Sequence, residues 1–470
     1  MSFYSIIDKL NGIAWGPWML ILLVGTGIYL TIKLNFLQFR KFKYALKNTI
    51  GKIFEKTEAK EGEITPFQAV STALAATIGT GNIAGVTGAI AIGGPGAVFW
   101  MWISAILGMA TKYAEIVLAV FYREKNEQGD WVGGPMYYIK NGLHPSFHFL
   151  SIIFCILGSI AAIGTGGMTQ INTIASSINT TLSSFGMHLA SFTFLNQIIN
   201  YSSLVIGVLL AFVVGLVLFG GIKRIGAVAE RVVPFMGIIY VALAVILIIY
   251  NINIVDDIFL MIFKGAFNVK AALGGAFGIT LIKTIRNGVG RGVFSNEAGL
   301  GTAPMAHALT SETSPVKQGM YGIFEIFMDT IIVCTLTAFI VLCGYMNGVD
   351  ISWGVNHGIE LVSSGLSVLY GAQFSSLVLS ICITLFALST MLTWALYGAR
   401  CFTYLFGEKT NKTYYILFVL GIVVGACLKL DIVWLIAETF NGFMTIPNLI
   451  ALLLLAPKVK QLTNEHFKHN

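Results

Sequence analysis

One stretch in the first part of the chain places glycine, threonine and asparagine inside an otherwise apolar run. It reads Ala75-Ala76-Thr77-Ile78-Gly79-Thr80-Gly81-Asn82. Each glycine lowers helix stability by about 1 kcal/mol relative to alanine, so two glycines flanking a threonine favour local unwinding. Carbonyl groups freed by unwinding can coordinate a cation, and N–H groups at the start of the next half-helix can hold a carboxylate. The alternative is that Gly79 and Gly81 are small residues where two helices pack closely.

A second glycine-rich stretch, Gly274-Gly275-Ala276-Phe277-Gly278-Ile279-Thr280, opens an apolar segment in the second half of the chain. Two interrupted helices at corresponding positions of two halves are the best sequence indication of a transporter binding site. We therefore expect this stretch to be a second helix break, at the place in the second half that corresponds to the first break, with small-residue packing as the alternative.

Three carboxylic acids, Glu325, Asp329 and Glu438, fall within apolar segments. A charge at the centre of a membrane helix costs about 2.5–3.5 kcal/mol on insertion scales, so each of these groups requires a partner or a function. Glu325 and Asp329 are four residues apart and share a helix face. We expect Glu325 to meet Lys283 or Arg286. The glycine-rich stretch from Arg286 to Lys317 is expected to be a cytoplasmic loop, in which His307 is solvated. Asp329 is a candidate for ion coupling, and a buried salt bridge that locks the helices together is the alternative.

The composition indicates whether these segments are surrounded by water or by lipid. Hydrophobic residues make up 56% of the 470 residues, charged residues only 11%, and the mean hydropathy is +0.80. A soluble domain usually carries about 25% charged residues, so this chain would have little polar surface to show to water. Several apolar runs are near or above the ~20 residues that cross a bilayer. The sequence predicts an all-α polytopic membrane protein.

We predict eleven membrane-spanning helices within a single transmembrane domain, residues 1–470. They cover roughly 14–34, 66–92, 96–122, 148–180, 203–221, 229–251, 266–288, 319–345, 370–404, 413–428 and 431–456. The first is an extra helix, and the other ten divide into two sets of five, 66–251 and 266–456. The two opening helices run in opposite directions, which is the pattern of inverted-topology repeats.

Lysine and arginine are concentrated in alternate loops. The first loop holds Arg40, Lys41, Lys43, Lys47, Lys52, Lys56 and Lys60, whereas the loops at 181–202 and 346–369 hold none. The positive-inside rule therefore places the N-terminus outside and the C-terminus in the cytoplasm. We expect a multi-pass protein of the plasma (inner) membrane.

Several motifs resemble the alanine or glycine:cation symporter family. The most specific is Gly93-Gly94-Pro95-Gly96-Ala97-Val98-Phe99-Trp100-Met101-Trp102. The others are Gly79-Thr80-Gly81-Asn82-Ile83, Ala110-Thr111-Lys112-Tyr113-Ala114-Glu115, Gly133-Gly134-Pro135-Met136-Tyr137-Tyr138-Ile139 and Phe294-Ser295-Asn296-Glu297-Ala298-Gly299-Leu300-Gly301. The resemblance implies a LeuT-type core of five plus five helices, coupling to sodium, and a small neutral amino acid as the substrate. Some members of the family are thought to take glutamine.

The resemblance also implies a substrate site at the first break. The backbone N–H groups of Thr80 and Gly81 would bind the substrate carboxylate, with the side-chain oxygen of Asn82 beside them. Gln170 would be the glutamine of the pocket, and its carbonyl would accept from the substrate ammonium. The alternative is that Gln170 only joins two helices by a hydrogen bond.

Two aromatic residues would form the walls of this pocket. Trp394 follows Thr390 by one helical turn, so both can face the substrate. Phe277, with Gly278 next to it, would approach from the second break. A bulky wall near the substrate side chain favours glycine and alanine over leucine. Ordinary aromatic packing is the alternative for both rings.

A sodium site is implied by the same resemblance. Its ligands would be the carbonyl oxygens of Ala75 and Ile78 and the hydroxyls of Ser389 and Thr390, because a hard cation prefers oxygen ligands. The two hydroxyls can instead bond back to carbonyls of their own helix.

Other classes of function fit the sequence less well. A channel filter usually comes from rings of carbonyls or charged side chains, and nothing here resembles one. An enzyme would need paired ligands or a nucleophile and a base, but the seven histidines show no such pairing and the six cysteines have no CxxC spacing. We expect that the protein is not an enzyme, has no cofactor and does not bind nucleic acid. The closest alternative is a proton-coupled amino-acid transporter of the same fold, and alanine, glycine, serine and glutamine remain open as substrates.

Overall fold

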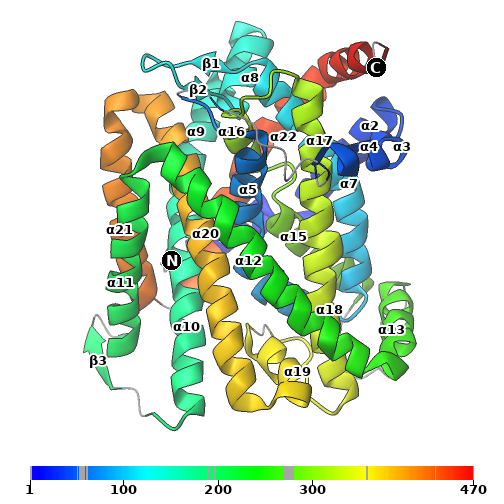
Figure 1. The fold of residues 1–470 in the computed structure, drawn as a ribbon, viewed down its shortest axis with the longest axis vertical. Helices are drawn as coiled ribbons and strands as arrows, with labels where there is room; N and C mark the ends of the chain where they lie inside the picture. The colour runs from blue at the N-terminus through cyan, green and yellow to red at the C-terminus, as the bar shows by residue number, and fades with distance from the viewer. Residues whose placement is uncertain are drawn as a thin grey trace.

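The computed structural model describes residues 3–49, 51, 59, 62–187, 190–194, 197–267, 280–355, 358–428 and 430–468. The described chain forms a bundle of long helices (Figure 1). The hairpin of β1 (Glu124–Lys125) and β2 (Trp131–Val132), helix α8 (Pro135–Gly142) and the C-terminus lie at one end. Strand β3 (Ser191–Phe194), α13 (Val255–Phe267) and α19 (Glu360–Tyr370) lie at the other end.

The helices of the bundle are interrupted at several places by 3₁₀ or π turns. In chain order they are α1 (Phe3–Ala14), α2 (Pro17–Lys33), α3 (Leu37–Arg40), α4 (Phe42–Thr49), α5 (Pro66–Thr77), η2 (Thr80–Asn82), α6 (Ala84–Gly93), α7 (Ala97–Phe121), α8, η3 (Pro145–Phe147), α9 (Phe149–Ala161), η4 (Ala162–Met168), α10 (Thr169–Ser184), α11 (Tyr201–Leu218), α12 (Gly221–Tyr250), η5 (Ile252–Ile254), α13, α15 (Leu281–Asn296), α16 (Ala303–His307), α17 (Pro315–Ile326), η6 (Phe327–Cys334), α18 (Thr335–Met346), α19, α20 (Ala372–Phe406), η7 (Glu408–Thr410), α21 (Asn411–Cys427) and α22 (Leu430–Lys468).

Nine of the helical stretches among the described residues are long and apolar enough to cross a membrane. The bent pair Pro66–Thr77 and Thr80–Gly93, with an angle of 53° between its halves, makes a tenth span. The prediction of an all-α polytopic membrane protein is therefore confirmed. Two short antiparallel hairpins, β1–β2 and β3–β4 (Gln197–Asn200), stand where only loops were expected. In the second hairpin, alternating Phe, Thr and Ile favour extended backbone.

The predicted break of the first core helix is confirmed. Helix α5 starts from a capping box, in which the Thr65 hydroxyl accepts from the Gln68 N–H and the Gln68 side chain accepts from the Thr65 N–H. It ends at Thr77, and a single 3₁₀ turn, η2, then leads into α6. The unwound backbone lies deep in the bundle, where only a protein-lined interior can accommodate it.

The predicted second break falls almost entirely outside the described residues, and the structure shows a further break after α15. The stretch 274–279, which includes Phe277 and Gly278, lies outside the described residues. The expected helix end at 288 and the expected loop from 286 to 317 are wrong, because α15 continues to Asn296 and α16 follows after a break at 297–302. Gly288 and Gly292 in α15 serve close packing and do not mark a loop. A Cβ added at Gly288 would lie 2.4 Å from the Ala97 carbonyl oxygen of α7.

Two long helices contain π turns next to candidate site residues. The π turn η4 separates α9 from α10 and ends two residues before Gln170. The π turn η6 separates α17 from α18 and contains Asp329 and Thr330. Such turns free backbone carbonyls and often mark functional positions.

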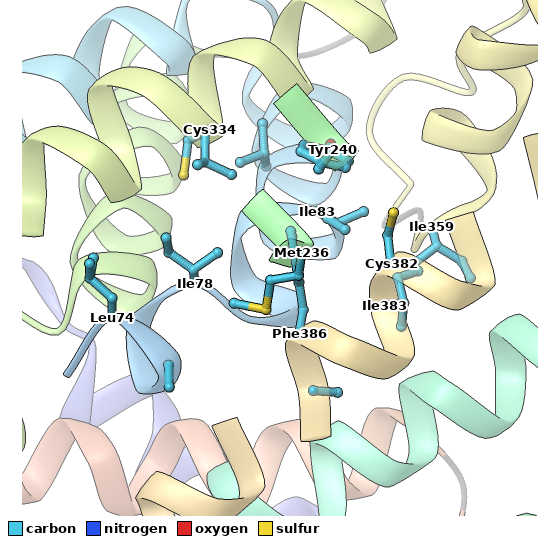
Figure 2. Packing of buried hydrophobic residues seen from close by; sticks show 14 of the residues in the cluster. Leu74, Ile78, Ile83, Met236, Tyr240, Cys334, Ile359, Cys382, Ile383 and Phe386 are labelled. Carbon is cyan, nitrogen blue, oxygen red and sulfur yellow. The ribbon is translucent and has the colours of Figure 1, made fainter. Parts of the chain in front are cut away.

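Buried apolar side chains surround the first break (Figure 2). Ile78 and Ile83 flank the break, and Met236 and Tyr240 of α12 face Phe386 of α20. The rings of Tyr240 and Phe386 are 5.6 Å apart. This packing holds α12 and α20 against the unwound segment and keeps lipid away from its polar groups.

Candidate functional site

The 3₁₀ turn η2 meets the helix that follows the π turn η4. The Thr80 hydroxyl donates to Gln170 Oε1 at 3.1 Å, and Gln170 Nε2 donates to the Thr165 carbonyl oxygen at 3.1 Å. Thr80, Gly81 and Gln170 are all buried. Two residues predicted to hold the substrate from opposite sides are therefore in direct contact.

Asn82 links the first break to the π turn η6. Its Nδ2 donates to Asp329 Oδ1 at 2.7 Å, and its Oδ1 accepts from the Gly79 N–H at 2.8 Å. The Asn82 side-chain oxygen, which was expected beside the substrate, therefore accepts a hydrogen bond from the backbone of the break. Through its Nδ2, Asn82 connects that backbone to the Asp329 carboxylate.

Asp329 is fully buried and is surrounded by neutral donors. The Ser295 hydroxyl lies 3.1 and 3.0 Å from its two carboxylate oxygens, and the Thr330 hydroxyl donates to Oδ2 at 2.7 Å. No described lysine, arginine or histidine forms an ion pair with it. A buried carboxylate without a counter-charge is expensive. Among the described residues no salt bridge forms at Asp329, and its role in ion coupling stays a prediction.

The other two intramembrane carboxylates have partners from distant helices. Glu325 was expected to meet Lys283 or Arg286, and this is wrong. Its Oε1 accepts from Lys112 Nζ at 3.3 Å, and its Oε2 accepts from His307 Nε2 at 3.2 Å. His307, expected in a solvated loop, is fully buried because it belongs to α16. Glu438 pairs with Arg291 at 2.6 Å.

The hydroxyls of Ser389 and Thr390 lie against the end of α5. Thr390 Oγ1 is 2.9 Å from the Ala75 carbonyl oxygen and 2.9 Å from that of Phe386 in its own helix. Ser389 Oγ is 2.8 Å from the Phe386 carbonyl oxygen and 3.5 Å from that of Ala75. Both predicted partners, the broken helix and the hydroxyls' own helix, are therefore present. Ile78 is the C-cap of α5 and directly precedes Gly79, whose added Cβ would lie 2.5 Å from Thr390 Oγ1.

Trp394 closes this region from the side of α20. Its side chain is buried and packs on the π turn η4, where a Cβ added at Gly166 would lie 2.0 Å from the Trp394 Cβ. The next glycine, Gly167, has its nearest neighbour, the Phe418 ring, at 3.5 Å. Only Gly166 is needed to let the tryptophan approach η4.

We expect Gly166→Ala to lower the free energy of unfolding by about 1–3 kcal/mol, because the added methyl group overpacks the contact with Trp394. Gly167→Ala is the matched control and should leave the melting temperature nearly unchanged. Thermal unfolding of the two purified variants in detergent tests this difference. Equal melting temperatures would show that η4 can move away from Trp394 at little cost.

A cleft of about 300 Å³ lies next to the first break. Phe294 lines the cleft, and its ring also lies 3.6 Å from the position of a Cβ added at Gly81. Arg291 and Glu438 form their ion pair in the same cleft. Phe294 therefore stands between the cleft and η2. Ser295, Phe294 and Arg291 were missed as site residues because they were assigned to a loop, although the first two belong to the Phe294–Gly301 motif.

The chain is similar to known proteins along nearly its whole length. The profile described as the sodium:alanine symporter family matches residues 1–470. The chain is 42% identical over 462 residues to the sodium/alanine symporter AgcS of Methanococcus maripaludis, covering 97% of this chain and 95% of that protein. It is 36% identical to the probable sodium/glutamine symporter GlnT of Bacillus subtilis, covering 97% and 88% of the two chains.

A solved structure shares the fold. The crystal structure of MhsT in complex with L-phenylalanine superposes with a TM-score of 0.56 at 13% identity, over 86% of this chain and 98% of that one. At this identity the likeness concerns the fold alone. It confirms the expected LeuT-type architecture.

Proposed function

The chain belongs to the sodium:alanine symporter family, and from this premise we propose that it imports alanine or glycine together with sodium. It is a multi-pass membrane protein that carries out cation-coupled amino-acid symport, and it is not an enzyme. The observation that carries the proposal is the contact of Thr80 with Gln170 at the unwound segment, beside the uncompensated carboxylate of Asp329. Sodium is a cargo of this transport and not a resident cofactor.

The substrate would bind in place of the contact between Thr80 and Gln170. Its carboxylate would accept from the N–H groups of Thr80 and Gly81, which the unwinding frees. Its ammonium would donate to Gln170 Oε1, which now accepts from Thr80. Trp394, held against Gly166, would limit the length of the side chain and favour alanine or glycine. The name of the relative GlnT keeps glutamine as the second candidate.

Sodium would bind at two places in this arrangement. The first is formed by the carbonyls of Ala75 and Ile78 with the hydroxyls of Ser389 and Thr390, as supported by the contacts between α5 and α20. The second is the carboxylate of Asp329, which also contacts Asn82 and therefore the substrate-binding turn. A cation at either place would stabilise the break in one conformation and so couple ion binding to substrate binding.

Alternating access would involve the two proposed repeats, 66–251 and 266–456. Phe294 and the ion pair between Arg291 and Glu438 would close the route from the cleft to the substrate. The basic helices α3 and α4 lie at the end of the bundle that also carries the C-terminus (Figure 1). This supports placing the first basic loop and the C-terminus together on the cytoplasmic side of the plasma membrane.

Uptake of labelled alanine and glutamine into proteoliposomes tests the function. One set of vesicles has an inward sodium gradient, and in the other set choline replaces sodium and a proton gradient is imposed. Alanine accumulation that requires sodium is the expected result. Preferential glutamine uptake would be compatible with sodium-coupled symport, but it would show that Trp394 does not limit the substrate to short side chains. Accumulation with protons and without sodium would reject the sodium sites.

Thr390→Ala should raise the sodium concentration for half-maximal alanine uptake about tenfold, the equivalent of about 1.4 kcal/mol. The variant removes one of the four proposed oxygen ligands and leaves the two carbonyls. Thr384→Ala is the control, because the Thr384 hydroxyl donates to the Ser380 carbonyl of its own helix. An unchanged sodium dependence in Thr390→Ala would assign that hydroxyl to helix capping alone.

A further inference from the structure

A second buried polar cluster lies beside the break between α15 and α16 and adjoins the proposed binding site, where Trp394 hydrogen-bonds to Glu297. It contains Lys112 and Glu115 of α7, Glu297 at the end of α15, His307 of α16, and Glu325 of α17, all with at most 2% of their surface exposed. Lys112 interacts electrostatically with all three glutamates. The cluster thus holds three carboxylates and one lysine.

His307 lies beside Glu325 in this cluster. Its Nε2 is 3.2 Å from Glu325 Oε2, and its Nδ1 is 2.8 Å from Gln318 Nε2. Gln318 Oε1 in turn accepts from the Thr310 hydroxyl at 3.1 Å. Lys112 Nζ lies 3.3 Å from Glu325 Oε1 and is the one lysine of the cluster, so it is shared among three carboxylates.

The two oxygens of Glu115 have very different surroundings. Oε1 accepts three hydrogen bonds, from the N–H groups of Gly299 and Gly301, each at 3.1 Å, and from Asn448 Nδ2 at 2.6 Å. Oε2 is buried and has no hydrogen-bond partner among the described residues. An ionised carboxylate oxygen without a donor in a protein interior is strongly unfavourable. The buried Tyr397 hydroxyl, which interacts electrostatically with Glu297 and Glu325, also has no partner there.

From these contacts we propose that Glu115 binds a proton on Oε2, and that this proton sets how tightly α7 holds the break between α15 and α16. A proton fits the site better than a metal ion, because no group of three or more His, Cys, Asp or Glu side chains in the described part of the chain is arranged to hold a metal. A proton requires only one oxygen, whereas a hard metal ion requires several.

The proton acts on the break through Oε1. Hydrogen bonds from N–H groups to a charged carboxylate are about twice as strong as those to a neutral acceptor. Gly299 and Gly301 both adopt positive φ, at 91° and 79°, and their N–H groups are freed by the break. Protonation of Glu115 weakens both bonds and lets the segment move. The groups around Glu115 that can modulate its charge are Lys112, Glu325 and Tyr138, and Glu297 acts indirectly because it shares Lys112.

Infrared spectroscopy of the purified full-length protein tests the proposal without a transport assay, so its failure is separate from a failure of the proposed function. The wild type should show the carbonyl stretch of a protonated carboxyl group, identified by its shift in D2O. Glu115→Gln should lose this band, and Glu127→Gln, on an exposed loop, should retain it. Retention of the full band in Glu115→Gln, or its loss in Glu297→Gln, would overturn the assignment, as would the absence of any such band in the wild type.

A second variant and a second measurement keep the proposal testable if Glu115→Gln does not fold. Glu115→Asp keeps a carboxyl group in the site, so the band should shift in frequency, and an unchanged band overturns the proposal. Hydrogen exchange tests the effect on the break. At alkaline pH, where only the wild type carries a carboxylate, a peptide covering Gly299 and Gly301 should exchange faster in Glu115→Gln than in the wild type at the same pH. Equal exchange would reject the link to the break.

Discussion

Asp329→Asn should reduce the apparent affinity for sodium in amino-acid uptake about 100-fold, which corresponds to about 2.7 kcal/mol. Asparagine has nearly the same shape, and the hydroxyls of Ser295 and Thr330 can rotate to accept from its amide. The packing of η6 is therefore preserved and the negative charge is lost. Hydrogen bonds and ion contacts to a charged, buried group contribute more than those to a neutral one, so the loss should be concentrated in cation binding.

Uptake into proteoliposomes, measured as a function of sodium at saturating alanine, gives this affinity directly. Asp257→Asn is the control, because Asp257 lies on the exposed side of α13. The melting temperature of Asp329→Asn should stay close to that of the wild type. Uptake by Asp329→Asn with an unchanged sodium dependence would remove Asp329 from ion coupling and leave Ser389 and Thr390 as the coupling site.

The first break could be predicted because its signal is local. A single residue separates Gly79 from Gly81 in an apolar run, and the resulting unwinding depends mainly on helix propensity. The break at 297–302 was not predicted by the same rule. Gly288 and Gly292 also follow each other closely, yet their missing side chains serve contacts with α7, where added Cβ atoms would lie 2.4 Å from the Ala97 carbonyl and 2.3 Å from the Ser104 hydroxyl. Glycine in a membrane helix therefore marks either a break or a close contact, and only the partner helix decides.

The contacts of the site residues were predictable only where the resemblance supplied them. The structure brings Thr80 to Gln170 and Thr390 to Ala75, which the resemblance had grouped in one site, and their binding roles stay predictions. The pairing of Glu325 with Lys112 joins residues 213 positions apart. A sequence gives no distance between such residues, so nearness along the chain favoured Lys283 and Arg286 and was misleading.

The partner of Glu325 leads to the prediction with the largest effect on stability. Lys112→Met should lower the free energy of unfolding by about 3–5 kcal/mol, because it leaves a buried carboxylate without its counter-charge. Lys140→Met is the matched control. Lys140 pairs with Glu124 at 3.2 Å, but both side chains are more than a third exposed, so the expected change is about 0–1 kcal/mol.

The double variant Lys112→Met/Glu325→Gln separates the charge from the packing. Its glutamine can still accept from His307 Nε2, and no uncompensated charge remains at that position. Removing both partners of a buried pair is often nearly neutral, so the double variant should recover most of the lost stability. Chemical unfolding of the four proteins in the same detergent measures this recovery. A double variant no more stable than Lys112→Met would mean that the aliphatic part of Lys112, which packs against α17, provides the stabilisation. The charge balance of the cluster would then contribute little.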